Sequence, residues 1–300
     1  MSFLGPLAAL GTSICWSFTS TFFTLAGRRV GSMVVNRVRL VLAVAFLMLS
    51  HWVLLGTPFP WHVAPERWFW LGLSGMLGLV IGDAMLFQSF VLLGPRLSML
   101  IMSLVPVIST LFAWVLLSEW LSVRQMTAIL VTVGGVASVI LDQKGNNAAI
   151  VEGKAYLIGV LFGLGGAVGQ AAGLIAAKKG LTGDFSALSG TLIRMFVAMV
   201  ALWAITLLMR QGQDTLRRLK ENRQACIYLF TGAFFGPFLG VYLSLVAVQA
   251  TQVGIASTLM SLPPVFLLPI SHVVFGERIG VRAVVGTLVA IVGVAMLLLS

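Results

Sequence analysis

The sequence predicts an all-α integral membrane protein in which ten transmembrane helices form two inverted five-helix repeats. Three observations support this prediction: the scarcity of charge, the succession of long apolar segments, and an internal repeat. Of the 300 residues, 59% are hydrophobic and 9% are charged, whereas a soluble domain carries about 25% charged residues. A surface this poor in charge suits contact with lipid, where α-helices satisfy their own backbone polar groups.

Ten segments have the length and character of membrane spans. A span needs about 20 mostly apolar residues, and the short breaks between these segments carry most of the charges. No basic residue precedes the first segment, so we interpret it as a true span and not as a cleavable signal peptide. The predicted spans are 3–26, 34–55, 68–92, 97–118, 124–141, 155–177, 186–208, 225–249, 254–275 and 281–299.

The chain repeats itself at a separation of 158 residues. The stretch 102–141 falls on 260–299 without a gap, so that Pro106 meets Pro264 and Glu119 meets Glu277. Shared hydrophobicity alone would not reproduce a proline and a glutamate at one fixed offset. We therefore predict two units of similar fold, 1–150 and 151–300.

The number of spans in each half has a topological consequence. Five is odd, so the second half enters the membrane from the opposite side, and the halves are predicted to be inverted repeats. Secondary transporters recurrently use this arrangement, with the substrate held near the midplane between the halves. The sequence thus favours a transporter that moves a small metabolite across the cytoplasmic (inner) membrane by alternating access. A gated channel or passive facilitator on the same scaffold is the alternative.

The repeated motif resembles that of the drug/metabolite transporter superfamily, in particular its EamA family. Each copy has a proline, then Gly or Ser followed by Glu, then a glycine-rich helix; the copies are Pro106, Ser118-Glu119, Gly134-Gly135 and Pro264, Gly276-Glu277, Gly286, Gly293. The resemblance covers essentially the whole chain, although Ser118 stands where the family usually has Gly. It implies a ten-span carrier of metabolites, such as amino acids or drug-like compounds.

Asp83 is the one acidic residue well inside a predicted span. It follows Arg67 by 16 residues, or about 24 Å along a helix. An ionisable group at this depth is expensive, so a functional role is the default hypothesis. Asp83 is expected to bind a substrate amine or a proton as coupling ion, or else to form a structural ion pair with Arg39. Its counterpart in the repeat is Val241, so any role is asymmetric.

Two arginines occupy matching positions in the second span of each half. Arg39 and Arg194 have the planar fork that holds a carboxylate through two hydrogen bonds. The alternative is that each reaches from a span end to the membrane surface, which the neighbouring Arg37 favours.

Further polar and aromatic residues are candidates for the walls of a cavity. Gln88, Tyr242 and Gln249 belong to the third and eighth spans, and Trp16 to the first. Packing between helices is the alternative for each of them.

The fourth and ninth spans carry the residues of the repeated motif. Pro106, Pro263 and Pro264 remove helical hydrogen bonds. They are expected either to leave a carbonyl free for a ligand or to kink these spans beside the pathway. Glu119 and Glu277 close the same spans, and we interpret them as structural because each precedes a helix that stabilises negative charge. The alternative is that they serve as a gate or as coupling carboxylates. Ser122 and Gln125 fit a capping box for the fifth span.

Other classes of function are disfavoured by what the sequence lacks. His51, His62 and His272 have no metal-ligand spacing, and no nucleotide-binding loop or nucleophile elbow is present. No basic run is interleaved with aromatic residues, so nucleic acid is not an expected partner. We expect that the protein is not an enzyme and that it binds no cofactor and no metal. Its expected partners are a small-molecule substrate, protons as a coupling ion, and the lipid bilayer.

The distribution of basic residues and the family resemblance predict opposite orientations. Loops and span edges after odd-numbered spans hold twelve Lys and Arg residues, and those after even-numbered spans hold four. The excess of positive charge in cytoplasmic loops places the odd-numbered loops in the cytoplasm and both termini outside. The resemblance implies the reverse. We favour the charge argument, and both orientations stay open.

Overall fold

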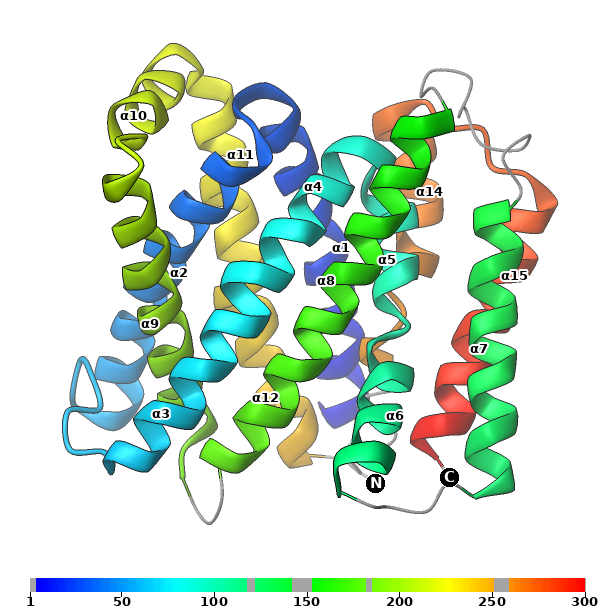
Figure 1. The fold of residues 1–300 in the computed structure, drawn as a ribbon, viewed down its shortest axis with the longest axis horizontal. Coiled ribbons are helices and arrows are strands. Elements are labelled where there is room, and N and C mark those ends of the chain that lie inside the picture. The colour runs from blue at the N-terminus through cyan, green and yellow to red at the C-terminus, as the bar shows by residue number, and fades with distance from the viewer. Residues whose placement is uncertain (1–3, 118–121, 142–152, 182–184, 251–258, 300) are drawn as a thin grey trace.

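The computed structural model describes residues 4–117, 122–141, 153–181, 185–250 and 259–299, which form helices joined by short connections (Figure 1). The first half contains α1 (Leu4–Val30), α2 (Ser32–Leu55), α3 (Pro65–Ser74), the π-helix η1 (Gly75–Gly82), α4 (Asp83–Leu93), α5 (Pro95–Met102), α6 (Val105–Leu117) and α7 (Val123–Leu141). The second half contains α8 (Gly153–Gly180), α9 (Ala187–Leu208), α10 (Gly212–Glu221), α11 (Arg223–Ala233), the π-helix η3 (Phe234–Gly240), α12 (Val241–Ala250), α14 (Pro263–Phe275) and α15 (Val281–Leu298).

The described helices belong to a multi-pass membrane protein. Six of them are long and apolar enough to cross a bilayer, and three shorter ones are also apolar. The helix α1 has 27 residues and a more polar composition. Its hydroxyl side chains are buried against the other helices and bond mainly to carbonyls of their own helix; they include Thr12, Ser17, Thr21 and Thr24.

The helix bounds agree with the predicted spans to within four residues, except that the start of the ninth span lies outside the described residues. Span three is continuous from α3 through η1 to α4, and span eight from α11 through η3 to α12. The break between the predicted spans 186–208 and 225–249 contains the short helix α10, which the sequence did not predict. The predicted capping box is confirmed, because Ser122 and Gln125 exchange bonds of 2.9 and 3.2 Å between side chain and backbone.

The two halves run through the molecule in opposite directions. In Figure 1 α1 rises from the lower face to the upper face, whereas α8 begins at the upper face and descends. The first span of each half packs on the third span of the other half, α1 on α11–η3–α12 and α8 on α3–η1–α4. The helices α2 and α7 pack on their own counterparts, α9 and α15. The halves therefore interlock and share their cores, as where Leu40 and Leu79 pack with Leu192.

Two departures from regular α-helix, a π-helix and a break in the helix, each occur twice in the chain. The two copies are separated by 158 residues, which is the separation of the sequence repeat. The π-helix η1 ends at Gly82 and η3 ends at Gly240. Span four breaks at Ser103–Leu104, between α5 and α6, and the chain leaves helical geometry again at the matching Ser261–Leu262 before α14. A π-helix carries one extra residue per turn and is frequent at functional sites, which directs attention to the residues that follow η1.

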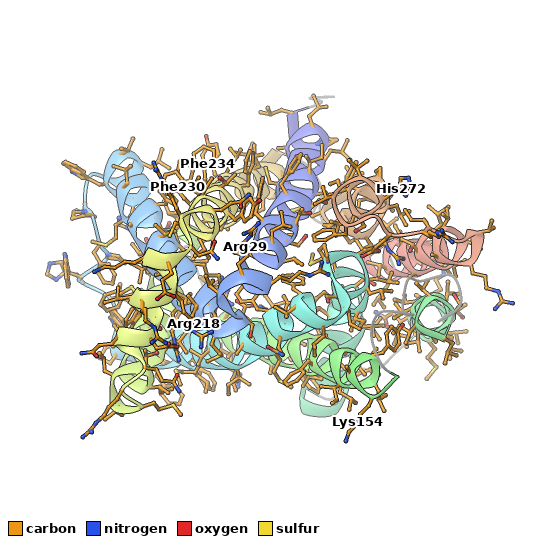
Figure 2. The ribbon with its side chains drawn as sticks, turned by 90° about the horizontal axis from the view of Figure 1, so that it is seen from above. Arg29, Lys154, Arg218, Phe230, Phe234 and His272 are labelled. Atoms are coloured by element: carbon orange, nitrogen blue, oxygen red, sulfur yellow. The ribbon has the colours of Figure 1, made fainter. Side chains whose placement is uncertain are left out.

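The upper face carries the basic connections. Figure 2 looks onto it and shows Arg29 at the end of α1, Lys154 at the start of α8, and Arg218 on α10. Asp214 accepts hydrogen bonds from Arg217 and Arg218 at 2.6 and 2.8 Å there. The hydrogen bond from Arg218 has the largest effect, and together with that from Arg217 it lowers the pKa of Asp214 below its ordinary value.

Candidate functional site

Asp83 begins α4 directly after the π-helix η1. It lies about 15 Å from the upper end of its span and about 27 Å from the lower end, at a helical rise of about 1.5 Å per residue. Its backbone N–H donates to the carbonyl of Gly78, five residues back, which is the π-helical pattern. The π-helix thus delivers a carboxylate to the interior near the middle of the membrane.

Glycines let the neighbouring span approach this carboxylate closely. A Cβ on Gly169 of α8 would lie 2.7 Å from the Cα of Gly82, which no packed structure permits. The backbones of α8 and η1 are therefore in direct contact. This contact brings Gln170 of α8 to Asp83, with 2.6 Å between Gln170 Nε2 and Asp83 Oδ1.

Arg39 of α2 forms a buried ion pair with Asp83. One guanidinium nitrogen donates to Asp83 Oδ2, and the exposed fractions of the two residues are 6% and 5%. Arg39 Nε donates to Asn36 Oδ1 at 3.2 Å, and the guanidinium lies over the ring of Phe87 at 4.9 Å from its centre. The ion pair is thus held on several sides. The neighbouring Arg37 instead bonds to Thr215 and Gln211 near the upper face.

Arg194 of α9 reaches the same region from the other half. A Cβ on Gly78 would lie 3.7 Å from Arg194 Nη2 and 3.4 Å from Gln170 Oε1, so the guanidinium of Arg194 lies near the amide that bonds to Asp83. Its buried Nε has no hydrogen-bond acceptor among the described residues. The predicted residues Asp83, Arg39 and Arg194 therefore come together, and we call them, with Gln170, the midplane cluster.

The other predicted cavity residues show no contact with this cluster where their side chains are described. Gln88, on α4, accepts a hydrogen bond of 2.6 Å from Ser32. Trp16 on α1 faces Gly240 at the end of η3, where a Cβ would lie 3.0 Å from the indole nitrogen. Tyr242 is about half exposed. Gln249 is part of α12, but its side chain lies outside the described residues.

The predicted prolines stand at helix starts. Pro106 is the second residue of α6, and Pro263 and Pro264 are the first two of α14. Proline suits the first turn, where its missing N–H would have no helical partner. These spans are thus broken and restarted at the prolines, and are not continuous helices with a kink.

The two predicted glutamates differ in what the structure shows. Glu119 lies outside the described residues. Glu277, between α14 and α15, accepts a hydrogen bond of 2.8 Å from the nearly inaccessible Arg96 of α5. Arg28 of α1 lies over the ring of Phe275 at 4.8 Å. Glu277 thus joins the two halves at the upper face, a contact that its position before a helix did not reveal.

Two residues at the site, the cluster member Gln170 and the adjacent Asn36, were not among the candidates from the sequence. Gln170 stands as an isolated amide in the glycine-rich sixth span, and Asn36 lies one turn before Arg39. Gln170 directly follows Gly169, where α8 approaches the neighbouring span closely. A polar residue next to such a glycine is a usable signal, because its side chain is directed at the neighbouring helix. Asn36 donates to the carbonyl of Leu79 within η1 at 3.3 Å. This contact between α2 and the π-helix could not be predicted from the position of Asn36 in the sequence.

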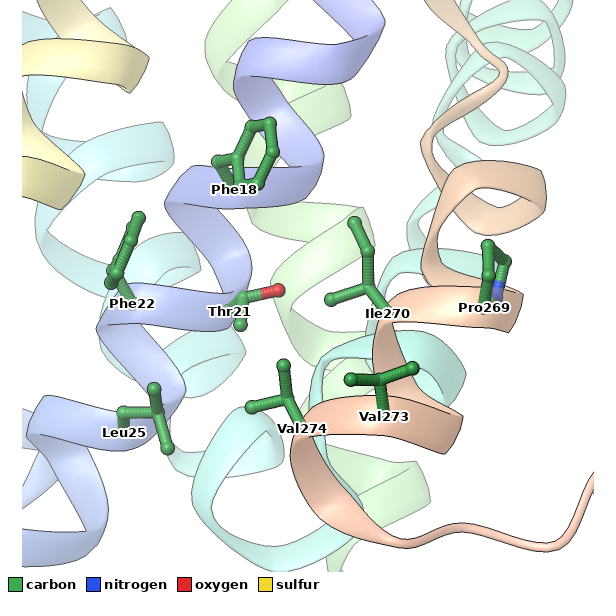
Figure 3. A pocket seen from close by; sticks show the side chains of 8 residues that line it. All are labelled: Phe18, Thr21, Phe22, Leu25, Pro269, Ile270, Val273 and Val274. Atoms are coloured by element: carbon green, nitrogen blue, oxygen red, sulfur yellow. The ribbon is translucent and has the colours of Figure 1, made fainter.

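An apolar groove of 360 Å³ lies between α1 and α14, away from the midplane cluster. In Figure 3 side chains of α1 form one wall and those of α14 the other. Thr21 is the one lining residue with a polar side chain, and its hydroxyl donates to Ser17 in its own helix. The groove offers no charged group to a solute, so the midplane cluster remains the candidate site.

Comparisons with known proteins agree with this architecture. No curated protein matches the chain. A solved structure named only "Crystal structure of protein" is 16% identical, with a TM-score of 0.61 and 97% of each chain covered, which shows a shared fold. The sequence model of the EamA-like transporter family matches residues 3–141 and again 157–299. With both repeats matched, the chain belongs to the EamA-like transporter family.

Proposed function

We propose that this transporter is a secondary carrier for a small metabolite, with the midplane cluster as its substrate and ion site. The observation that carries the proposal is that charged residues from both halves meet near the middle of the membrane. Arg39 and Asp83 come from the first half, and Gln170 and Arg194 from the second. Carriers built from inverted repeats bind their substrates at this place, between the halves.

Packing alone does not account for the cluster. A buried ion pair stabilises a protein little compared with well-packed apolar residues, because both charges lose their hydration. Ionisable groups inside a membrane mark substrate or ion pathways by default. Asp83 is the member that can take up a proton. We infer that protonation releases Arg39 and thereby couples proton movement to the binding of the solute.

The contacts around the cluster favour access from the lower face. At the upper side α4 packs on both α1 and α2. The matching α12 makes no comparable contact with α8 or α9 in the described part of the chain. The Arg96–Glu277 pair also joins the halves at the upper face. We infer that alternating access requires this pair to break and α12 to close.

Orientation follows from the charge of the two faces. We propose that the protein resides in the inner membrane and that its basic upper face is exposed to the cytoplasm, because basic residues accumulate on the cytoplasmic side. A reporter fused after Ser300 tests this orientation. The upper-face assignment requires the reporter to be outside the cytoplasm, and a cytoplasmic signal would reverse it.

Countertransport in proteoliposomes tests the carrier mechanism. Vesicles loaded with a mixed amino-acid pool should exchange labelled amino acids saturably in the wild type. Asp83→Asn should lose the dependence on a pH gradient, because the amide cannot take up the proton. Asp214→Asn makes the same chemical change at an exposed acid and should behave as the wild type.

The alternative outcomes separate the competing mechanisms. Solute flux without stimulation by solute on the opposite side would identify a channel or passive facilitator instead of a carrier. Exchange that keeps its pH dependence in Asp83→Asn would retain the carrier and exclude Asp83 as the proton site.

A further inference from the structure

The midplane cluster contains two cations and one anion. Both oxygens of Asp83 are engaged, one by Arg39 and the other by Gln170. Arg194 forms no ion pair with any described residue, and its side chain donates no hydrogen bond to one. The cluster therefore has one positive charge in excess inside the membrane, where an unpaired charge is costly.

The repeat explains how this excess arises. Arg39 and Arg194 are counterparts in the two halves, and so are Asp83 and Val241. The first half supplies an acid for its arginine, whereas the second half has valine at that position. The structure thus keeps both arginines and places a single carboxylate between them.

From this imbalance we propose that the transported solute carries a carboxylate, which binds to Arg194. A single negative charge balances the cluster, and the guanidinium holds a carboxylate through two parallel hydrogen bonds. Because Asp83 is engaged by Arg39 and Gln170, the site selects its solute by the anionic group and not by an amine. This assignment of substrate class rests on the carrier function proposed above.

The absence of a side chain at Gly78 leaves space beside the guanidinium of Arg194. The position that a Cβ of Gly78 would take lies within 4 Å of both Arg194 Nη2 and Gln170 Oε1. Gln170 donates to Gly78 O at 3.3 Å as well as to Asp83. A carboxylate at Arg194 would therefore lie beside the pair that also carries the proposed proton site, so that solute and proton affect each other through charge.

The first test compares acids with their amides on the wild-type protein. Countertransport of labelled amino acids in proteoliposomes is competed with phenylalanine, leucine and glutamine, and with the corresponding amino-acid amides, which keep the amine and side chain. We expect competition by the acids and at least about 30-fold weaker competition by the amides, the factor that the loss of one partner of a buried charge pair implies. Equal competition by the amides would overturn the proposal but leave the carrier function intact.

The second test uses Arg194→Gln and Arg194→Lys. The acids should stabilise the wild type against heat, Arg194→Lys partly, and Arg194→Gln not at all. Arg194→Gln without solute should melt no lower than the wild type, which shows that it folds. Thermal stabilisation of the wild type by chloride but by none of the acids would assign the charge to an inorganic ion and overturn the proposal. Absence of exchange with every solute pool would overturn both this proposal and the carrier function.

Discussion

The surroundings of Asp83 and those of its counterpart Val241 are built from the same parts but differ in charge and in packing. Each residue follows a π-helix, and each repeat contributes an arginine from its second span. Around Asp83 the helices α1, α2 and α4 are packed together, whereas α12 makes no comparable contact with α8 or α9 in the described residues. One acid-to-valine difference therefore coincides with the difference between the tightly packed upper side and the looser lower side.

This comparison teaches how an inverted repeat acquires a directional site. The symmetric elements place the site at the midplane. They are the paired arginines, the π-helices and the broken spans. The asymmetric carboxylate then decides which arginine is neutralised and which remains to hold a ligand. Each of the following predictions changes one side of this comparison.

The largest expected effect distinguishes the two arginines. Arg39→Gln leaves the buried carboxylate of Asp83 without its cation and should lower the free energy of unfolding by about 3–5 kcal/mol. Arg194→Gln removes a cation that has no ion-pair partner among the described residues and should leave stability unchanged or raised. Thermal unfolding in detergent compares them, and an equal loss in both variants would contradict the charge assignment.

The interface between α7 and α15 gives a symmetric reference for packing. A Cβ on Gly135 would lie 2.8 Å from the Cα of Ala290, and one on its counterpart Gly293 would lie 2.9 Å from the Cα of Thr132. Gly135→Ala should therefore lower the free energy of unfolding by about 1–3 kcal/mol through overpacking. The adjacent Gly134 has open space, and Gly134→Ala should stabilise by up to about 1 kcal/mol. Equal effects of the two alanines in thermal unfolding would refute the close approach.

The Arg96–Glu277 pair tests the closure of the upper side. Glu277→Gln removes the negative charge that holds the buried Arg96 and should open the upper side more often. Ser98, two residues after Arg96 on α5, is fully buried against Ser89 of α4, so Ser98→Cys reports such opening when Cys15 and Cys226 are replaced by serine. A membrane-impermeant maleimide at the upper face should label it several-fold faster in the Glu277→Gln variant, and an unchanged rate would show that the pair does not close this side.

The smallest expected effect concerns the surface acid Asp214. Its pKa is lowered from the ordinary 3.8 by the hydrogen bonds from Arg218 and Arg217. A lowered pKa in the folded state means that the contribution to stability is present above pH 3.8 and is lost as the pH falls below it. Because Asp214 is exposed and screened by solvent, Asp214→Asn should barely change the melting temperature at neutral pH. A large change would mean that α10 is anchored more firmly than its exposure indicates.

Much of the fold was predictable because the bilayer imposes its own rules on the sequence. Span bounds agree within a few residues because apolar length is a direct requirement of the hydrocarbon core. The repeat at 158 residues also appears in the structure, because η1 and η3 end at the matching Gly82 and Gly240. The helix α10 was not predicted, because a short helix rich in charge lacks the long apolar run that marks the spans.

The candidate site was only partly predictable, and the reason is geometric. Sequence singled out Asp83, Arg39 and Arg194 because ionisable residues are rare at membrane depth. It offered an Arg39–Asp83 pair as one alternative, but the part played by Gln170 depends on how closely α8 approaches η1. That approach is set by glycines on both helices and by their relative rotation, which span length and composition leave undetermined.

The sequence by itself determined a membrane protein of two related halves, the family it belongs to, and the single acid at depth. Those properties follow from composition, spacing and repetition, which the bilayer converts directly into helices of set length. Only the tertiary structure decided which arginine Asp83 neutralises, which amide supports it, and that Glu277 joins the halves through Arg96. Such choices depend on the distances between side chains of different helices, which arise from packing and cannot be derived from either helix alone.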